Sequence, residues 1–195
     1  MPLPVLHALR CAGAASPTRI GAFTGLTEPD VESALIDLGV EGFVTRSYDA
    51  WSLTDAGRAE NVRRVTAELD AAGARDSLRA AFQRFLVLNP ELLDLCTAWQ
   101  LRPEHGTFSV NDHTDPAYDA RVLDRFADLD RRFAPVGDEL AAALPRLRRY
   151  RVRLTGALER AVSGEQQFVT DSTASYHTIW AELHEDLLVT LGLPR

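Results

Sequence analysis

Three short runs near the N-terminus carry apolar residues at helical spacing, with turn-forming residues between them. The first run ends at Gly13, and the second begins at Ser16-Pro17, an N-cap residue followed by proline at the first helical position. The third run begins after Thr27, and its apolar residues lie on one helix face: Val31, Ala34, Leu35 and Leu38. The pattern therefore predicts three consecutive short helices.

Two short β-prone segments follow, at residues 43–46 and 51–53. Tyr48-Asp49-Ala50 lies between them, so the two segments are expected to pair as a small hairpin. Thr54 then caps a fourth helix. Helix, helix-turn-helix, hairpin and helix is the order of a winged helix-turn-helix, in which the hairpin is the wing. Residues 1–66 are therefore predicted to form a winged helix-turn-helix domain.

The remaining residues, 67–195, are predicted to form a bundle of five or six helices. One helix is expected to start at Asn89-Pro90, a long one at Asp115-Pro116, and the last one near Thr173. Pro135 is expected to kink or end the long helix, because proline lacks a backbone N–H. Residues 101–114 are interpreted as a polar loop. The expected fold class is mainly α, with a β-hairpin wing in the first domain and a helical C-terminal domain.

The charge of the chain restricts its partners. The 195 residues carry a formal net charge of −7, and all 21 basic residues are arginine, so nucleic acid could bind only at a local basic face. No apolar run is long enough to span a membrane and no signal peptide is recognised, which predicts a cytoplasmic protein without a membrane partner. Cys11 and Cys96 make neither a disulfide framework nor a metal motif.

One stretch resembles the MarR-type winged-helix transcriptional regulators: Val31-x-x-Ala34-Leu35-x-x-Leu38-x-x-x-Gly42-Phe43-Val44, followed by Trp51-Ser52-Leu53-Thr54-Asp55-Ala56-Gly57-Arg58. The resemblance implies that the third helix enters the major groove of DNA, that the hairpin acts as the wing, and that the protein is a homodimer. Residues 89–100, 111–119 and 175–188 resemble a group of actinobacterial winged-helix proteins with a helical C-terminal domain.

The predicted third helix is unusually acidic for a helix that reads DNA. Glu28, Asp30 and Glu32 lie at its start, and phosphate groups repel carboxylates. The candidate DNA contacts are therefore the basic and small polar residues around this helix and the wing: Arg19, Thr27, Ser33, Arg46 and Ser47. The alternative is a winged helix that no longer binds DNA and contacts a protein partner or supports catalysis.

The C-terminal part contains many aromatic and hydrogen-bonding residues, which are typical of a small-molecule pocket. The candidate ligand contacts are Trp99, Gln100, Asn111, Asp112, His113, Tyr118, Tyr176, His177, Trp180 and His184. His177 and His184 lie two helical turns apart, roughly 10.5 Å, which is too far for one metal ion, so no metal site is predicted. The alternatives are that these histidines are hydrogen-bonded core or dimer-interface residues, or that one of His113, His177 and His184 is a general acid or base.

The sequence therefore predicts a homodimeric DNA-binding regulator whose helical domain binds a small-molecule effector. No phosphate loop, nucleophile elbow or cofactor fingerprint is present, so neither an enzymatic activity nor a cofactor is assigned. Five arginines between Arg146 and Arg153 are interpreted as a solvated basic face, with an anion site, a nucleic-acid contact or an acidic partner surface as the alternative.

Overall fold

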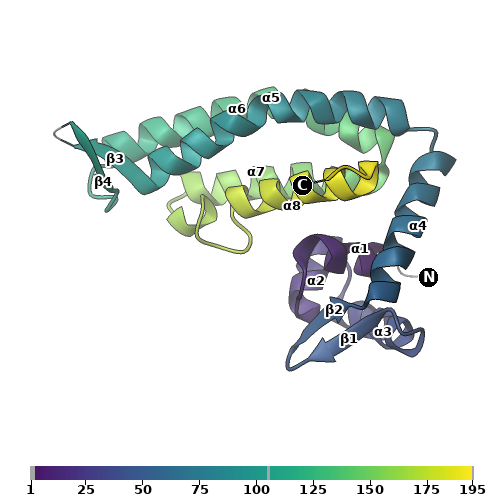
Figure 1. Ribbon diagram of the computed structural model, residues 1–195. Coiled ribbons are helices and arrows are strands. Elements are labelled where there is room, and N and C mark those ends of the chain that lie inside the picture. The colour runs from purple at the N-terminus through teal and green to yellow at the C-terminus, as the bar shows by residue number, and fades with distance from the viewer. Residues whose placement is uncertain (1–2, 105, 195) are drawn as a thin grey trace. The chain divides into compact units, whose positions relative to one another are not determined.

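The computed structural model describes residues 3–104 and 106–194, and it is mainly α-helical, as predicted (Figure 1). The chain divides into two compact units, Met1–Arg75 with His184–Arg195, and Asp76–Leu183. The sequence analysis placed this division at residue 66, which lies inside the continuous helix that ends at Ala71. It also assigned the last residues of the chain to the second unit, whereas His184–Arg195 belongs to the first.

The first unit contains four helices and a two-stranded antiparallel sheet. The helices are α1 (Leu3–Ala12), α2 (Pro17–Thr24), α3 (Glu28–Val40) and α4 (Asp55–Ala71), and the strands are β1 (Val44–Ser47) and β2 (Ala50–Leu53). The N-caps are those predicted: the side chains of Ser16, Thr27 and Thr54 each accept a hydrogen bond from the first turn of their helix. In the sheet, Val44 pairs with Leu53, and Arg46 pairs with Trp51.

The junction between β2 and α4 explains why Gly57 is a glycine. A Cβ atom at this position would lie 1.9 Å from the carbonyl oxygen of Phe43, so no other residue fits without a backbone shift. The Thr54 hydroxyl donates to the carbonyl of Gly42 at 2.7 Å, and Arg58 donates to the carbonyl of Leu53 at 3.0 Å. These contacts fasten α4 to the hairpin.

The core of the first unit surrounds α1, which contacts α2, α3, α4 and β2. Its buried apolar residues come from all four helices and include Val5, Leu6, Leu9, Ile20, Phe23, Val31, Leu35, Leu38, Val65 and Leu69. The helical periodicity found in the sequence therefore corresponds to the buried faces of these helices.

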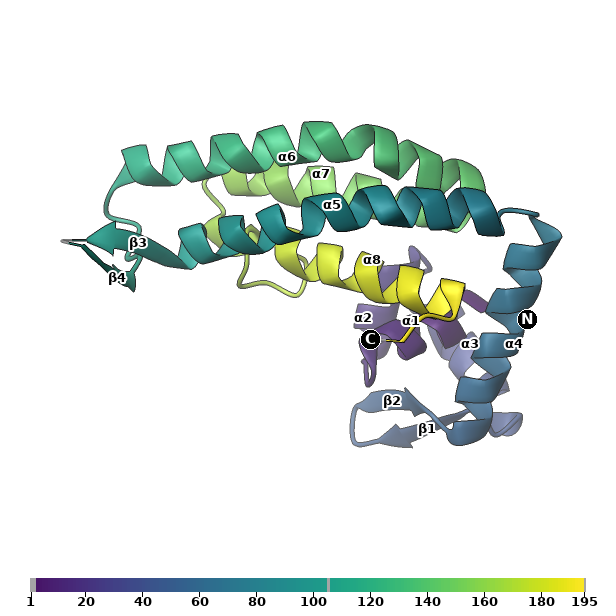
Figure 2. The same cartoon turned by 45° about the horizontal axis from the view of Figure 1, so that its top comes forward.

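The second unit is a bundle of long helices that run side by side (Figures 1 and 2). They are α5 (Arg75–Gln100), α6 (Pro116–Ala143), α7 (Arg148–Val162) and the first half of α8 (Tyr176–Leu191), with short 3-10 helices at Pro145–Leu147 and Gln166–Phe168. In the described part of the chain this unit thus has four α-helices instead of the predicted five or six.

Two prolines account for this difference. Pro90 was expected to start a helix and Pro135 to kink or end one, but α5 continues through Pro90 and α6 does not end at Pro135. Both prolines are exposed, so water can satisfy the carbonyl groups that lose a partner on the outer side of each helix. By contrast, α6 does end before Pro145, at Ala143.

The segment interpreted as a polar loop contains a second hairpin. Strands β3 (Leu101–Glu104) and β4 (Thr107–Val110) pair antiparallel, with Leu101 opposite Val110. The hairpin was missed because Arg102 and Pro103 do not have the alternating apolar pattern of a half-buried strand. Within the described residues, none of the helices combines the length and apolar character needed to cross a membrane.

Candidate functional site

The residues predicted to contact DNA lie on α2, α3 and the β1–β2 hairpin. Ser33, Arg46 and Ser47 are exposed, whereas Arg19 is half-buried. The Thr27 hydroxyl caps α3, because it accepts a hydrogen bond from the backbone N–H of Asp30 at 3.4 Å. Its side chain therefore has a structural role that does not depend on DNA.

Arg46 is held on the hairpin by three neighbours. Its Nε donates to the carbonyl of Tyr48 at 3.1 Å, its guanidinium lies 3.7 Å from a carboxylate oxygen of Asp49, and it sits over the ring of Trp51 at 5.9 Å. Asp49 is fully exposed, and exposed ion pairs of this kind contribute about 0–1 kcal/mol. A phosphate group could therefore displace Asp49 at little cost.

Three arginines at the start of α4, behind the hairpin, form ion pairs with nearby acidic residues. Arg58 lies 2.8 Å from Asp55, while Arg63 and Arg64 both lie 2.6 Å from Glu60. Hydrogen bonds from these two arginines lower the pKa of Glu60 to about 2, so its carboxylate stays charged. Little net positive charge is left behind the hairpin.

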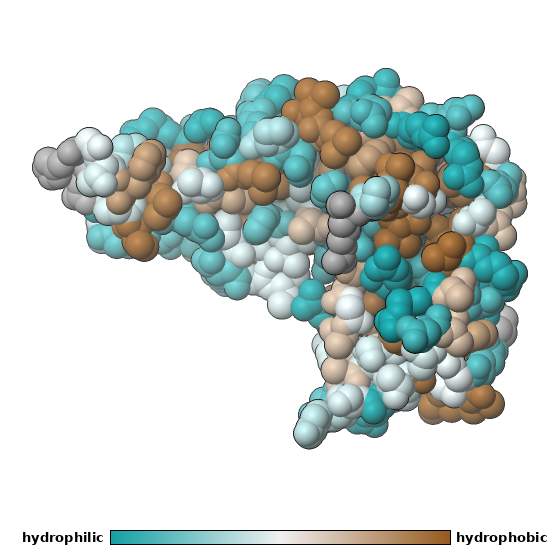
Figure 3. Space-filling model, in the orientation of Figure 1, coloured by the Kyte–Doolittle hydropathy of each residue, from teal (hydrophilic) through white to brown (hydrophobic). Residues whose placement is uncertain are grey.

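The exposed face of α3 combines carboxylates with apolar side chains. Glu28, Asp30, Glu32 and Asp37 are exposed, and Ile36 and Val40 expose 62% and 86% of their surface. Figure 3 shows an apolar patch over the end of α3. A shallow cavity of about 200 Å³ separates this face from the hairpin and is lined by Pro17, Glu32, Leu35, Ile36, Arg46 and Trp51.

Three of the predicted ligand residues come together beside the β3–β4 hairpin. The Asn111 side-chain amide donates to the carbonyl of Trp99 at 3.0 Å and to Asp119 at 2.8 Å. His113 Nδ1 lies 2.9 Å from the other carboxylate oxygen of Asp119, and the imidazole packs against the Trp99 ring at 4.6 Å. His113 has a φ of 58°, a rare value for a residue other than glycine, and its side chain is 25% exposed.

Three further predicted residues surround this network. The Tyr118 hydroxyl lies 2.7 Å from the carbonyl of Ala98 and 3.0 Å from that of Leu101, so it fastens α6 to the end of α5. Gln100 is exposed, and its carbonyl accepts the N–H of Asn111 at 2.8 Å. Asp112 is also exposed, and hydrogen bonds from Thr114 lower the pKa of its carboxylate.

Tyr176 and Trp180 lie elsewhere, in an aromatic core with Phe85, Phe126 and Phe133. The Tyr176 hydroxyl donates to Asp130 at 3.1 Å, and Trp180 Nε1 donates to the side chain of Asn89 at 3.0 Å. Burial, followed by the nearby charge of Asp130, raises the pKa of Tyr176 well above its usual value. The polar atoms of both aromatic side chains are thus satisfied within the bundle.

The two predicted histidines of the last helix belong to different units. His177, which is half-buried, belongs to the second unit, and His184 belongs to the first. Burial lowers the pKa of His184 below its usual value. The ten predicted ligand residues therefore form separate groups, and their role in binding a small molecule stays a prediction.

The arginines between Arg146 and Arg153 do not all point to solvent as interpreted from the sequence. Arg151 lies 2.7 Å from Asp130, and Arg153 lies 2.7 Å from Glu182. Sequence reasoning did not find these acids, nor Asp119, because a buried acid on a helix looks like any other acid in the sequence. The available signal was helical spacing: Asp130 lies four residues after Phe126 and three before Phe133, which places it on the same buried face of α6.

Comparisons of this chain with family models, with curated proteins and with solved structures give no significant match.

Proposed function

We propose that the protein is a winged-helix transcriptional regulator whose first unit binds duplex DNA mainly through its wing. The observation that carries the proposal is the order α1–α2–α3–β1–β2–α4 with an exposed hairpin that presents Arg46 and Ser47. At the tip of this hairpin, Tyr48 is 96% exposed and has a φ of 53°. A protruding hairpin beside a helix-turn-helix is the wing of this class of DNA-binding domain.

The charges around the hairpin define how such a protein would bind. The acidic face of α3 would be repelled by the phosphate backbone, so phosphate contacts are left to Arg46 and Arg19. With about two phosphates neutralised per protomer, and so about four per dimer, the logarithm of the binding constant should fall with the logarithm of salt concentration with a slope of about −3.6. The second unit would sense a small-molecule effector and join two copies into a homodimer. The candidate effector site is the partly exposed His113 network.

The test is a fluorescence-anisotropy titration of the protein against its own upstream DNA and against random duplex at several salt concentrations. Arg46→Ala removes one phosphate contact from each protomer of the dimer, so it should weaken binding to both duplexes roughly tenfold and reduce the salt slope by about 1.8. Arg131→Ala is the matched control, because Arg131 is also exposed and paired with a nearby acid, Asp128, but lies on the second unit. A parent protein that is a folded dimer by light scattering and binds neither duplex at low salt would exclude this function.

A second function is favoured by one observation, the exposed acidic and apolar face of α3. Ile36 and Val40 beside Glu32 and Asp37 suit a protein partner with a basic and apolar surface better than a nucleic acid. The double variant Glu28→Gln with Glu32→Gln distinguishes the two functions. If DNA is the partner, removing two repelling charges should strengthen binding to random duplex, whereas a protein-contact face should leave DNA binding absent.

A further inference from the structure

A cluster of polar side chains lies within the first unit, away from the DNA-contact residues. His7 and Cys11 are on α1, and Asp186 is on the last part of α8, which belongs to the same unit. His7 Nε2 lies 2.9 Å from Oδ1 of Asp186 and 3.6 Å from Sγ of Cys11. The three atoms all lie within 4.8 Å of one another.

We infer that His7, Cys11 and Asp186 form a binding site for a divalent transition metal of the zinc type. His7 and Cys11 are four residues apart on one helix, so their side chains project from the same face on consecutive turns. The donors are an imidazole nitrogen, a thiolate and a carboxylate oxygen, and the thiolate selects zinc-like ions over magnesium or calcium. The proposal holds whether or not the first unit binds DNA.

Two of the three ligand separations fit this coordination with small adjustments, and the third, between Sγ of Cys11 and the Asp186 carboxylate, is at most 4.8 Å. Zinc bonds of about 2.0–2.3 Å in a tetrahedron place the ligand atoms about 3.3–3.6 Å apart. The Sγ–Nε2 separation of 3.6 Å already has this value, and the Nε2–Oδ1 separation needs to open from 2.9 Å by a few tenths of an ångström. Three protein ligands leave one coordination position for water or another ligand.

The charges also balance at this site. His7 and Asp186 are almost fully buried, with relative exposures of 1% and 0%. A dication bound by one thiolate, one carboxylate and one neutral imidazole forms a complex without net charge, which suits a buried environment. Binding releases the thiol proton of Cys11, so the affinity should fall as the pH is lowered.

The residues around the three ligands can orient them. Asn61 is completely buried, and its side-chain nitrogen lies 3.3 Å from Nδ1 of His7, while its side-chain oxygen has no hydrogen bond within the described residues. Turning this amide would let the oxygen accept an N–H from Nδ1, which is the tautomer that leaves Nε2 for the metal. The Thr190 hydroxyl donates a hydrogen bond to Oδ1 of Asp186 at 3.0 Å.

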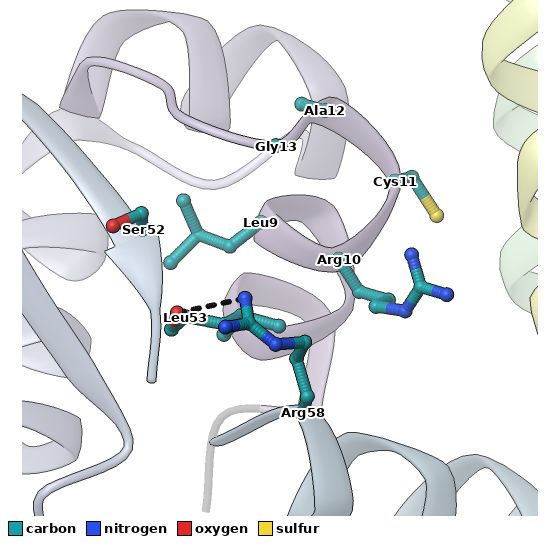
Figure 4. Close-up of a pocket in the computed structure, with 8 residues that line it drawn as sticks. All are labelled: Leu9, Arg10, Cys11, Ala12, Gly13, Ser52, Leu53 and Arg58. Carbon is teal, nitrogen blue, oxygen red and sulfur yellow. Dashed lines mark hydrogen bonds between the residues drawn. The ribbon is translucent and has the colours of Figure 1, made fainter. Parts of the chain in front are cut away.

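The same contacts argue against a catalytic cysteine. In a cysteine–histidine pair, the imidazole nitrogen that faces the thiol must accept its proton. Here Nε2 lies closer to Oδ1 of Asp186, at 2.9 Å, than to Sγ of Cys11, at 3.6 Å, so the carboxylate competes with the thiol for this nitrogen. Figure 4 shows Cys11 in the last turn of α1 with its thiol directed away from strand β2, and hence away from Ser52 and Leu53 in the neighbouring cavity.

The test uses the full-length reduced protein, freed of metal by a chelator and titrated with Co²⁺ as a spectroscopic probe. The parent should bind one Co²⁺ per chain with a thiolate-to-cobalt absorption band, which an equivalent of Zn²⁺ removes. Cys11→Ser should abolish the band and weaken Zn²⁺ binding at least tenfold in a competition titration. Cys96→Ser is the control and should keep the band, because Cys96 is buried in the second unit and burial raises its thiol pKa to about 12.

A second measurement needs no variant and so does not depend on the folding of one. Zn²⁺ should slow the reaction of the Cys11 thiol with a disulfide reagent in the parent protein at least tenfold, whereas Mg²⁺ should not. Absence of the cobalt band in the parent, a band that persists in Cys11→Ser, or a thiol reaction unaffected by Zn²⁺ would each overturn the proposal. DNA binding is not a readout in these experiments, so their outcome is independent of the proposed function.

Discussion

Each unit contains a histidine bonded to an aspartate and near an asparagine, but the two networks are built differently. In the first unit, His7 uses both ring nitrogens, with Asp186 at Nε2 and Asn61 at Nδ1. In the second unit, the carboxylate of Asp119 and the amide of Asn111 both lie at Nδ1 of His113.

The difference in burial gives these networks different consequences. The His113 network fastens the β3–β4 hairpin to the bundle and leaves 25% of the His113 side chain exposed to solvent. His7 is buried, with Asp186 and the Cys11 thiol at Nε2 and Asn61 at Nδ1. The same three residue types thus attach a hairpin to the bundle in the second unit and belong to a candidate metal site in the first.

Removing the aspartate from each network should give the largest effect and should separate the two. Asp186→Ala removes a hydrogen-bond partner from two buried groups, His7 and the Thr190 hydroxyl, so the metal-free protein should lose about 2–5 kcal/mol of unfolding free energy. Asp119→Ala should cost about 1–3 kcal/mol, because water can reach His113. Urea unfolding in the presence of a chelator measures both, and equal losses would show that the two networks are energetically equivalent.

A second comparison concerns one glycine from each unit. Gly57→Ala places a methyl group against the Phe43 carbonyl, so it should destabilise the protein by about 3 kcal/mol. Gly156→Ala is the matched change in α7, where a Cβ atom meets nothing within 4 Å, and it should stabilise the protein by about 0.5–1 kcal/mol. Thermal unfolding of both variants checks the signs, and a harmless Gly57→Ala would show that the β2–α4 junction is adaptable.

How much could be predicted from the sequence also differs between the units. The caps at Ser16, Thr27 and Thr54 are local signals, and they fixed the order of elements in the first unit. In the second unit, Pro90 and Pro135 gave misleading local signals, because long-range packing keeps the helices continuous on their inner faces.

The candidate sites depend on contacts between residues that are far apart in the sequence. Trp99, Asn111 and His113 were identified by their residue types and do lie together, but Asp119, the shared partner of Asn111 and His113, was not recognised. The His7 cluster was missed because its third member, Asp186, comes from the opposite end of the chain. Only the spacing of His7 and Cys11 could have suggested it.

The smallest expected effect is a difference between the two histidines of α8, His177 and His184, in how they change the pH dependence of stability. Burial, opposed by the charge of Glu185, lowers the pKa of His184 below its unfolded value of 6.5, so the unfolded chain binds a proton more readily than the folded one. Above pH 6.5 the His184 side chain is neutral in both states and has no effect on the unfolding free energy. As the pH falls through 6.5 towards the folded pKa, the unfolded chain takes up a proton first, so the unfolding free energy decreases. His184→Gln should make the unfolding free energy less dependent on pH between about 5 and 7, by a fraction of the 1.4 kcal/mol that one pKa unit represents. His177→Gln, on the same helix but in the second unit, is the control, and the same flattening in both variants would contradict an effect of burial specific to His184.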